Sequence, residues 1–443
     1  MRFLKGFYLT SRFLFIVVII VLSFFFGYYF PILFFLSKIL LVAFLTIIVI
    51  ESLIIFSNKS GLFAERILSD RLSNGDENEI KIVVTNNYAI KTRVKIIDEL
   101  PFVFQIRDFE INSELEKTTT KIFNYNIRPV KRGEYQFGAL NVYVSTMLNI
   151  VSRRYRFEQN KSVAVYPSYI QLKKYQLMAV SDRLFEVGVK KIRRIGHSME
   201  FEQIKEYVLG DDYRTVNWKA TARKRQLMVN HYVDEKSQQV YSILDMGRTM
   251  KMPFDKMSLL DYAINSSLVI SNIALLKQDK AGIIAFNNRV TSVLPAERNP
   301  LQMKKIVELL YSHQTEFLEA DYERLAAVVK SKIKQRSLLL FYTNFETANS
   351  LKRQMKYFKS LASSHLLIVI FFKNTGLDKL LSSKSDSIEE IYNKTIAEKF
   401  SFEKKIIQKE LASIGIQSIL TTPQQLSVNT INKYLELKAR GMI

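Results

Sequence analysis

Two long apolar stretches dominate the pattern of hydrophobic and polar positions near the N-terminus. No charged residue occurs between Arg12 and Lys38, and the next charge after Lys38 is Glu51. About twenty apolar residues span a bilayer as a helix, so the pattern predicts two transmembrane helices, near residues 13–29 and 33–54. A signal peptide is the alternative for the first stretch. It is disfavoured because no small-residue cleavage site follows and a second apolar stretch does.

The charges outside these stretches predict an orientation. Arg2, Lys5 and Arg12 precede the first predicted helix, and Lys59 and Arg66 follow the second. Loops rich in Lys and Arg stay on the cytoplasmic side of a membrane. We therefore expect a multi-pass protein of the cytoplasmic membrane, with both ends of the helical hairpin and the whole soluble region in the cytoplasm.

Residues 65–168 contain short runs in which apolar and polar positions alternate. In one of them, Val94 and Ile96 alternate with Arg93 and Lys95, as expected for a strand with one buried face. The runs are Glu79–Asn86, Thr92–Leu100, Lys121–Pro129, Glu134–Ser145 and Ser162–Pro167. Short strands at this spacing predict an antiparallel β-sandwich-like domain. No residue in it suggests chemistry, so we interpret it as a spacer or interaction module.

From residue 237 to 443, short apolar runs alternate with longer amphipathic segments. The expected strands are 239–244, 281–286, 290–294, 337–342, 365–372 and 416–420, and the expected helices are 256–276, 301–310, 322–332, 351–361, 389–413 and 424–438. This alternation predicts a mainly parallel sheet with helices on both faces. Ligands of such sheets bind beyond the carboxyl ends of the strands. Asp245 and Thr343–Asn344 directly follow strands, so we expect them to share that edge.

The intervening residues 170–236 are polar, basic and irregular. Val189–Arg194 holds four cations in six residues, and Trp218 is the only tryptophan of the chain. We expect a linker with short helices here. The chain is thus expected to have four parts. They are a transmembrane region (1–57), a β-sandwich-like domain (65–168), the irregular segment (170–236) and an α/β domain (237–443).

The irregular segment contains a dense motif between residues 200 and 223. It reads Glu200-Phe201, Ile204-Lys205-Glu206-Tyr207, Gly210-Asp211-Asp212-Tyr213-Arg214, Val216-Asn217-Trp218-Lys219-Ala220 and Ala222-Arg223. This motif resembles the signature of the domain-of-unknown-function family 58 (DUF 58), with Ile-Lys in place of the usual Leu-Arg. The resemblance covers roughly residues 185–375 well and the N-terminal parts weakly.

The resemblance implies more about architecture than about chemistry, because the activity of this family is not established. It implies a von Willebrand factor A-like (Rossmann-like) fold for the α/β domain. It also implies a bacterial inner-membrane protein that works beside a MoxR-type AAA ATPase, in the assembly or maturation of other proteins.

The loop that begins at Asp245 lies, by this resemblance, where von Willebrand factor A domains carry a metal-binding Asp-x-Ser-x-Ser motif. Asp245 and Thr249 offer the hard oxygen ligands that Mg²⁺ prefers, but Gly247 lacks the middle hydroxyl. In the second loop Asn344 stands where Asp is common, with Thr343 beside it. We therefore expect no cofactor or only weakly bound Mg²⁺. In the alternative, which we favour, Asp245 and Thr249 cap a helix or bond loop amides.

The signature segment also permits two interpretations. In the first, its charged residues form a surface that recognises a partner. In the second, which we favour, the aspartates cap the short helix that holds the tryptophan and pair with the arginines, while the tryptophan fills a core. The residues concerned are Glu200, Tyr207, Gly210, Asp211, Asp212, Arg214, Trp218 and Arg223.

The formal net charge of +22 raises the question of nucleic-acid binding. The cations are scattered over the whole chain rather than gathered in one stripe. A basic protein held at a membrane interacts favourably with anionic lipid. We therefore expect membrane lipid as a partner and no specific nucleic acid.

Little in the sequence indicates an enzyme. The chain has no Cys, its four His show no metal-ligand spacing, and no glycine-rich phosphate loop occurs. We expect a non-enzymatic membrane scaffold or assembly factor that binds a MoxR-type ATPase and other membrane or client proteins. A metal-dependent enzyme that uses the Asp245 strand-end site is the alternative.

Overall fold

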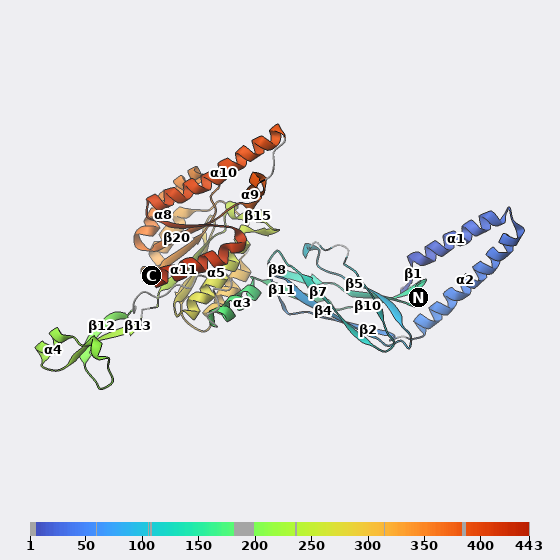
Figure 1. Ribbon diagram of the computed structural model, residues 1–443, viewed down its shortest axis with the longest axis horizontal. Helices are drawn as coiled ribbons and strands as arrows, with labels where there is room; N and C mark the ends of the chain where they lie inside the picture. Colours follow the sequence, from blue (N-terminus) through green and yellow to red (C-terminus); the bar gives the residue numbers. More distant parts are fainter. Residues whose placement is uncertain are drawn as a thin grey trace. The chain divides into compact units, whose positions relative to one another are not determined.

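The computed structural model forms two compact units, Met1–Tyr166 and Pro167–Ile443 (Figure 1). It describes residues 6–58, 60–104, 106, 109–180, 199–234, 237–313, 315–382 and 387–442. Arg2, Lys5, Lys59 and the basic run 189–194 lie outside the described residues. Each unit is described by itself.

The first unit contains a β-sandwich. Its strands are β2 (Leu62–Ile67), β3 (Arg71–Ser73), β4 (Asn78–Asn86), β5 (Thr92–Asp98), β6 (Ile111–Leu115), β7 (Thr120–Ile127), β8 (Gly133–Phe137), β9 (Leu140–Ser145), β10 (Val151–Phe157) and β11 (Lys161–Tyr166). A five-stranded sheet of order β1-β10-β9-β5-β6 packs on the sheet β2-β4-β7, and a third sheet has the order β3-β11-β8. All pairs are antiparallel except β3–β11. The predicted run 134–145 is two strands rather than one, β8 and β9.

Two apolar helices precede the sandwich, as the sequence predicts. They are α1 (Ser11–Gly27) and α2 (Pro31–Ser57). The 27-residue α2 is long and apolar enough to cross a membrane, and α1 is an apolar helix of 17 residues. The side chains of Ser23 and Ser37 hydrogen-bond between the two helices. The length and apolar composition of these helices support membrane association.

Both ends of this hairpin are attached to the same sandwich. Before α1, the strand β1 (Phe7–Leu9) pairs with β10 and forms the edge of the five-stranded sheet. In α2, the carboxylate of Glu51 is 2% exposed and accepts hydrogen bonds from the Thr146 hydroxyl and from the backbone N–H groups of Ile150 and Val151. The chain segments before and after the hairpin therefore lie on one side of any membrane that it spans.

Arg66 has a different role from the one that the charge pattern suggests. Its guanidinium is buried and pairs with the carboxylate of Asp98, which also accepts a 2.5 Å hydrogen bond from the hydroxyl of Tyr125. Arg66 lies on β2 and Asp98 on β5, so the pair joins the two facing sheets. Because this cation is inside the sandwich, it cannot interact with the membrane surface. Arg66 therefore does not help to determine the orientation of the hairpin in a membrane.

The second unit contains an α/β fold with a six-stranded sheet. Its strands are β14 (Gln239–Asp245), β17 (Lys280–Phe286), β18 (Val290–Glu297), β19 (Leu338–Tyr342), β20 (Leu366–Phe372) and β21 (Gln417–Thr421). In space they are ordered β18-β17-β14-β19-β20-β21, and all neighbours are parallel except β17–β18. Numbered along the chain this order is 3-2-1-4-5-6, the order of doubly wound sheets.

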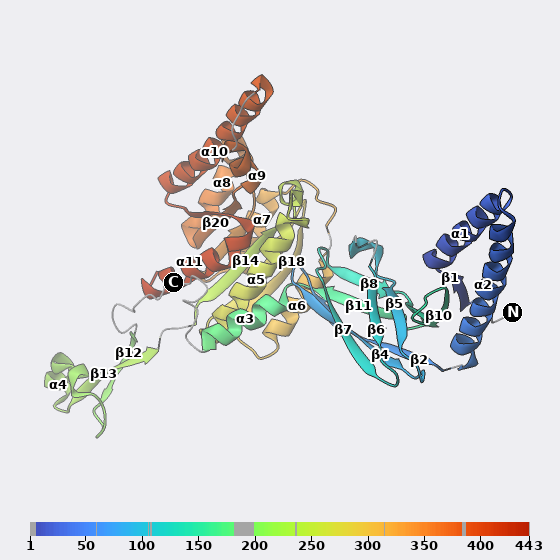
Figure 2. The same cartoon turned by 45° about the vertical axis from the view of Figure 1, so that its right-hand side comes forward.

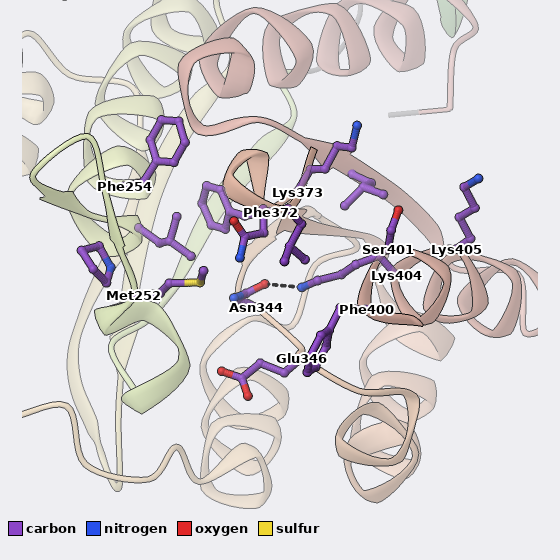
Figure 3. A pocket seen from close by; sticks show the side chains of 15 residues that line it. Met252, Phe254, Asn344, Glu346, Phe372, Lys373, Phe400, Ser401, Lys404 and Lys405 are labelled. Atoms are coloured by element: carbon purple, nitrogen blue, oxygen red, sulfur yellow. Dashed lines mark hydrogen bonds between the residues drawn. The ribbon is translucent and has the colours of Figure 1, made fainter. Parts of the chain in front are cut away.

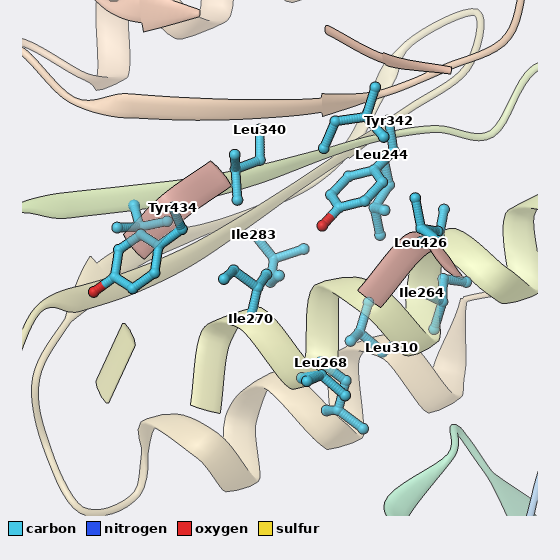
Figure 4. Packing of buried hydrophobic residues seen from close by; sticks show 14 of the residues in the cluster. Leu244, Ile264, Leu268, Ile270, Ile283, Leu310, Leu340, Tyr342, Leu426 and Tyr434 are labelled. Atoms are coloured by element: carbon cyan, nitrogen blue, oxygen red, sulfur yellow. The ribbon is translucent and has the colours of Figure 1, made fainter. Parts of the chain in front are cut away.

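Helices cover both faces of this sheet (Figure 2). They are α5 (Leu259–Leu276), α6 (Gln302–Ser312) and α11 (Leu426–Ala439) on one face, and α7 (Tyr322–Lys332), α8 (Ala348–Ser364) and α10 (Ile388–Ser413) on the other. Figure 4 shows Ile270 of α5 beside Ile283 of the sheet, and Leu268 of the same helix beside Leu310 of α6. The apolar α5 is itself mostly buried, so it is a core helix of this unit.

The described residues 167–180 and 199–234 are more structured than the sequence predicts. The helix α3 (Tyr169–Val180) packs on α5. The family-signature segment contains the antiparallel strands β12 (Met199–Glu206) and β13 (Met228–Asp234), with the short helix α4 (Trp218–Lys224) between them. The expectation of a linker with short helices alone is therefore wrong for this region. Elsewhere in the second unit, the sequence also did not predict α9 (Thr375–Ser382) or the small hairpin β15–β16 (Pro253–Phe254 and Met257–Ser258).

Candidate functional site

The sheet order brings two loops together at the carboxyl edge. The strands β14 and β19 are neighbours at the point where the order reverses, and crevices of doubly wound sheets open there. Asp245 ends β14, and Thr343 follows β19 directly. Their side chains meet, because the Thr343 hydroxyl donates a 2.6 Å hydrogen bond to Oδ2 of Asp245.

Asp245 is buried, and both of its carboxylate oxygens accept hydrogen bonds. Only 1% of its surface is exposed. Besides Thr343, the hydroxyl of Tyr322 donates to Oδ2 at 2.9 Å and the N–H of Gly247 donates to Oδ1 at 2.8 Å. Burial raises the pKa of Asp245, while these three hydrogen bonds act in the opposite direction. Within the described structure, both oxygens of the carboxylate are therefore already engaged by the protein.

Of the other three residues of the predicted weak metal site, Gly247 touches this carboxylate only through its backbone, and the described hydrogen bonds of Asp245 include neither Thr249 nor Asn344. A Cβ at Gly247 would come within 2.8 Å of Oδ1 of Asp245 and 2.9 Å of the Ala320 side chain, so close packing requires glycine there. Thr249 lies in a short 3-10 helix, Arg248–Lys251, and makes none of the described hydrogen bonds of Asp245. The side-chain oxygen of Asn344 accepts a hydrogen bond from Lys404 instead.

The favoured alternative for the Asp245 loop is thus partly realised. The carboxylate bonds a loop amide, that of Gly247, but it does not cap a helix. Among the described residues, no group of three or more His, Cys, Asp or Glu could hold a metal ion. Sequence reasoning missed Tyr322. The only signal for Tyr322 in the sequence was its place at the start of a predicted helix. In the structure, Asp321 caps that helix by accepting a hydrogen bond from the N–H of Arg324.

A cavity of about 340 Å³ lies at the same edge of the sheet, beside the ends of β19, β20 and β21 (Figure 3). Its walls are mainly apolar, and the side chain of Lys404 enters it from α10. The ammonium of Lys404 donates to Oδ1 of Asn344 at 2.7 Å and to the carbonyl oxygen of Phe345. Burial lowers the pKa of Lys404 to about 8, and the nearby charge of Glu346 partly offsets this effect.

The backbone of the signature segment is organised around the hairpin of β12 and β13. The N–H of Tyr207 donates to the carbonyl oxygen of Leu227, which closes the paired strands. Gly210 has φ +114, a conformation that other residues rarely adopt, and it sits in the turn that follows. Asn217 caps α4 by accepting from the N–H of Ala220. Glu200 lies in β12, and its side chain is outside the described part.

The described contacts of the charged signature residues differ from the expected acid–arginine pairs. Asp211 bonds the N–H of Val208 and forms an ion pair with Lys205. Asp212 caps a single 3-10 turn, Tyr213–Thr215, by accepting from the N–H of Arg214. Neither aspartate caps α4, which holds the tryptophan. The guanidinium of Arg214 lies over the Tyr213 ring, and Arg223 is exposed on α4.

Trp218 does not fill a core, contrary to the favoured expectation. It occupies the first position of α4 and is 73% exposed, and the nearby Leu209 and Tyr213 are 97% and 71% exposed. The physical reason is size. One hairpin and a seven-residue helix enclose too little volume to bury an indole, and among the described side chains of 199–234 only Met228 and Val229 are buried.

Comparison with known proteins supports the resemblance seen in the motif. Residues 203–375 match the family model described as "Protein of unknown function DUF58". A stretch of 124 residues is 30% identical to the uncharacterized protein YeaD of Bacillus subtilis (strain 168). That alignment covers 28% of this chain and 30% of YeaD, so the chain matches less than a third of its relative.

Similarities to solved structures are faint. A CARDB domain from Pyrococcus furiosus is 17% identical, with 24% of this chain and 94% of the domain covered and a TM-score of 0.17. Proximal thread matrix protein 1 from the mussel byssus is 10% identical, with 46% and 47% covered and a TM-score of 0.28. TM-scores this low support no argument about function.

Proposed function

We propose that this chain is a non-enzymatic membrane scaffold that binds a protein partner through its signature segment. The observation that carries the proposal is the set of exposed apolar side chains on that segment, with Trp218, Tyr213 and Leu209 the largest. Single exposed apolar side chains are normal on a protein surface, but several large ones on one short segment are typical of an interaction site. Trp and Tyr are also the residues that contribute most binding energy at interfaces.

The charge around these side chains indicates the kind of partner. Lys219, Arg223, Lys224 and Arg225 are all exposed on or next to α4. Arg and Lys at the rim of an apolar patch steer a partner of opposite charge and fix its orientation. The proposed partner surface is therefore an apolar groove bordered by acidic residues.

The family resemblance suggests which protein carries that surface. A MoxR-type AAA ATPase is the proposed partner, with client proteins of the membrane as further ones. The six-stranded sheet, with one antiparallel strand at its edge, is consistent with the proposed von Willebrand factor A-like identity of the α/β unit. The apolar α1 and α2 are the proposed anchor in the bacterial inner membrane, with the soluble region in the cytoplasm.

The alternative, a metal-dependent enzyme at Asp245, receives less support. A divalent ion at this carboxylate would have to displace the hydroxyl of Tyr322 or Thr343. It would also find few of the oxygen ligands that Mg²⁺ uses. Mg²⁺ binding at this carboxylate requires a rearranged loop.

Affinity capture from native membranes tests the proposal. The full-length tagged chain is expected to co-purify the AAA ATPase, identified by mass spectrometry, and Trp218→Ala should reduce the recovered ATPase at least about tenfold. Tyr392→Ala is the matched control, because Tyr392 is also an exposed aromatic, 66%, but lies on α10. Equal recovery with all three proteins would refute the proposed interface. Loss of binding to anionic vesicles with no change in ATPase recovery would assign the patch to lipid instead.

A further inference from the structure

We propose that the cavity beside β19, β20 and β21 is a binding site for a small apolar molecule that carries a single negative charge, such as a carboxylate. It is separate from the signature segment and goes beyond the scaffold function. The proposal rests on an apolar cavity that contains the partly buried ammonium of Lys404, which takes part in none of the described ion pairs.

The walls of the cavity are suited to an apolar body. The apolar side chains that line it come from the β15–β16 region, the N-terminus of α5, the ends of two strands and two helices. They include Met252, Phe254, Leu259, Phe372, Leu377 and Leu420. At about 340 Å³ the cavity lies at the lower end of the range of small-molecule sites, roughly 300–1,000 Å³. A bicyclic aromatic group or a medium-length acyl chain has a suitable size.

Lys404 supplies the polar contact. Its ammonium has three N–H donors, and the two hydrogen bonds described go to neutral acceptors, Oδ1 of Asn344 and the carbonyl oxygen of Phe345. None of the ion pairs within the described structure includes Lys404. A partly buried charge that forms no ion pair is unfavourable, so an anion that enters the cavity gains a charge-assisted hydrogen bond and relieves that cost.

The surroundings favour an anion over a neutral or cationic ligand. Lys373 and Lys405 lie at the rim, and Figure 3 shows Glu346 directing its carboxylate away from the Lys404 ammonium. The net field at the mouth of the cavity is therefore positive. One buried ammonium balances one negative charge, which indicates a monoanionic head group rather than a dianion.

The test uses two soluble naphthalene probes of similar size, one anionic and one neutral. The probes are 2-naphthoate and its neutral counterpart 2-naphthalenemethanol, titrated at pH 7 against the full-length chain in nanodiscs of zwitterionic lipid. Saturation-transfer NMR reports binding, and empty nanodiscs correct for uptake by lipid. The naphthoate is expected to bind more tightly than the alcohol by at least about tenfold, the factor for one hydrogen bond to a charged group.

Two variants locate the site. Lys404→Met keeps the length of the side chain and removes the charge, so it should abolish the preference for naphthoate. Lys409→Met, an exposed position on the same helix, should leave the preference unchanged. Leu420→Trp, which fills the cavity, should weaken binding of both probes and covers the case in which Lys404→Met fails to fold. Equal binding of the two probes by the parent protein, or unchanged naphthoate binding in Lys404→Met and Leu420→Trp, would overturn the proposal.

Discussion

The hydroxyl of Tyr322 donates a 2.9 Å hydrogen bond to the carboxylate of Asp245, from a helix that starts 77 residues further along the chain. The same hydroxyl lies 2.9 Å from the Thr343 hydroxyl, which also bonds that carboxylate. Three loops at the carboxyl edge of the sheet are thus joined through one buried acid. This arrangement stabilises the edge and leaves the acid little capacity for an external ligand.

Tyr322→Phe should destabilise the α/β unit by about 1.5–3 kcal/mol, because it removes a donor to a charged, buried acceptor. Denaturant unfolding of the full-length chain measures the change. Tyr357→Phe is the matched control, since the Tyr357 hydroxyl bonds Glu323 at the surface. Similar unfolding of both variants would mean that the Tyr322 bond contributes no more than an exposed one.

Trp218→Ala should change the free energy of unfolding by less than about 1 kcal/mol, because its side chain is mostly exposed. Phe358→Ala is the contrast, since Phe358 is fully buried and its truncation should cost about 3–5 kcal/mol. Thermal melting compares the two variants. A large loss in Trp218→Ala would show that the indole is covered in the intact protein.

The pH dependence of stability should reveal the ammonium of Lys404. Its pKa is lowered to about 8 in the folded state from an ordinary value of 10.5, so the charged form costs on the order of 3 kcal/mol below pH 8. Between pH 8 and 10.5 the unfolded chain binds more protons than the folded one, so this cost is progressively relieved as the pH rises. Lys404→Met should therefore be more stable than the parent at pH 7, with a difference that shrinks towards pH 10. Denaturant unfolding at both pH values measures it, with Lys409→Met as control, and a difference independent of pH would contradict the shifted pKa.

Glu51→Ala should loosen the connection between α2 and the sandwich. The substitution removes the acceptor of the Ile150 and Val151 N–H groups, and each buried donor left unsatisfied costs about 1–3 kcal/mol. Hydrogen exchange of residues 146–151 in nanodiscs should become at least about tenfold faster. Glu65→Ala, at an exposed position on β2, should leave this exchange unchanged. Equal protection in both variants would show that the carboxylate does not hold this loop.

The soluble region should lie in the cytoplasm. The positive-inside rule gives this orientation, and the pairing of β1 with β10 requires both ends of the hairpin to share one side. A reporter fused to the C-terminus measures it. Activity of a periplasm-dependent reporter, with silence of a cytoplasm-dependent one, would reverse the assignment.

Local patterns predicted much of the secondary structure of the second unit. The helix Tyr322–Lys332 starts and ends where its apolar spacing indicates, and the strongly apolar strands β19 and β20 lie within one residue of their predicted bounds. The strand β12 was missed. Its sequence, Met199–Glu206, carries four charged residues in eight and has neither the apolar run nor the regular alternation of a buried strand.

The arrangement of the site depended on contacts that a linear pattern does not contain. Asn344 was expected to act with Asp245, but it bonds Lys404, which is 60 residues away in the sequence. Arg66 was read as a cation near the membrane, but its partner Asp98 lies on the facing sheet. In both cases the residue type was informative, and the partner was fixed only when distant strands or helices came together.

The strand β1 has a consequence for how this protein is made. It is synthesised before the helical hairpin, yet its partner β10 appears only some 140 residues later. By the time β10 is synthesised, both helices have left the ribosome. The five-stranded sheet can therefore be completed only after the helices have emerged. A shortened version that begins after α2 would lack β1 and present β10 as an open edge with unpaired backbone groups. Such a fragment is predisposed to aggregate. In the full chain, β1 prevents this because it pairs with the edge of β10.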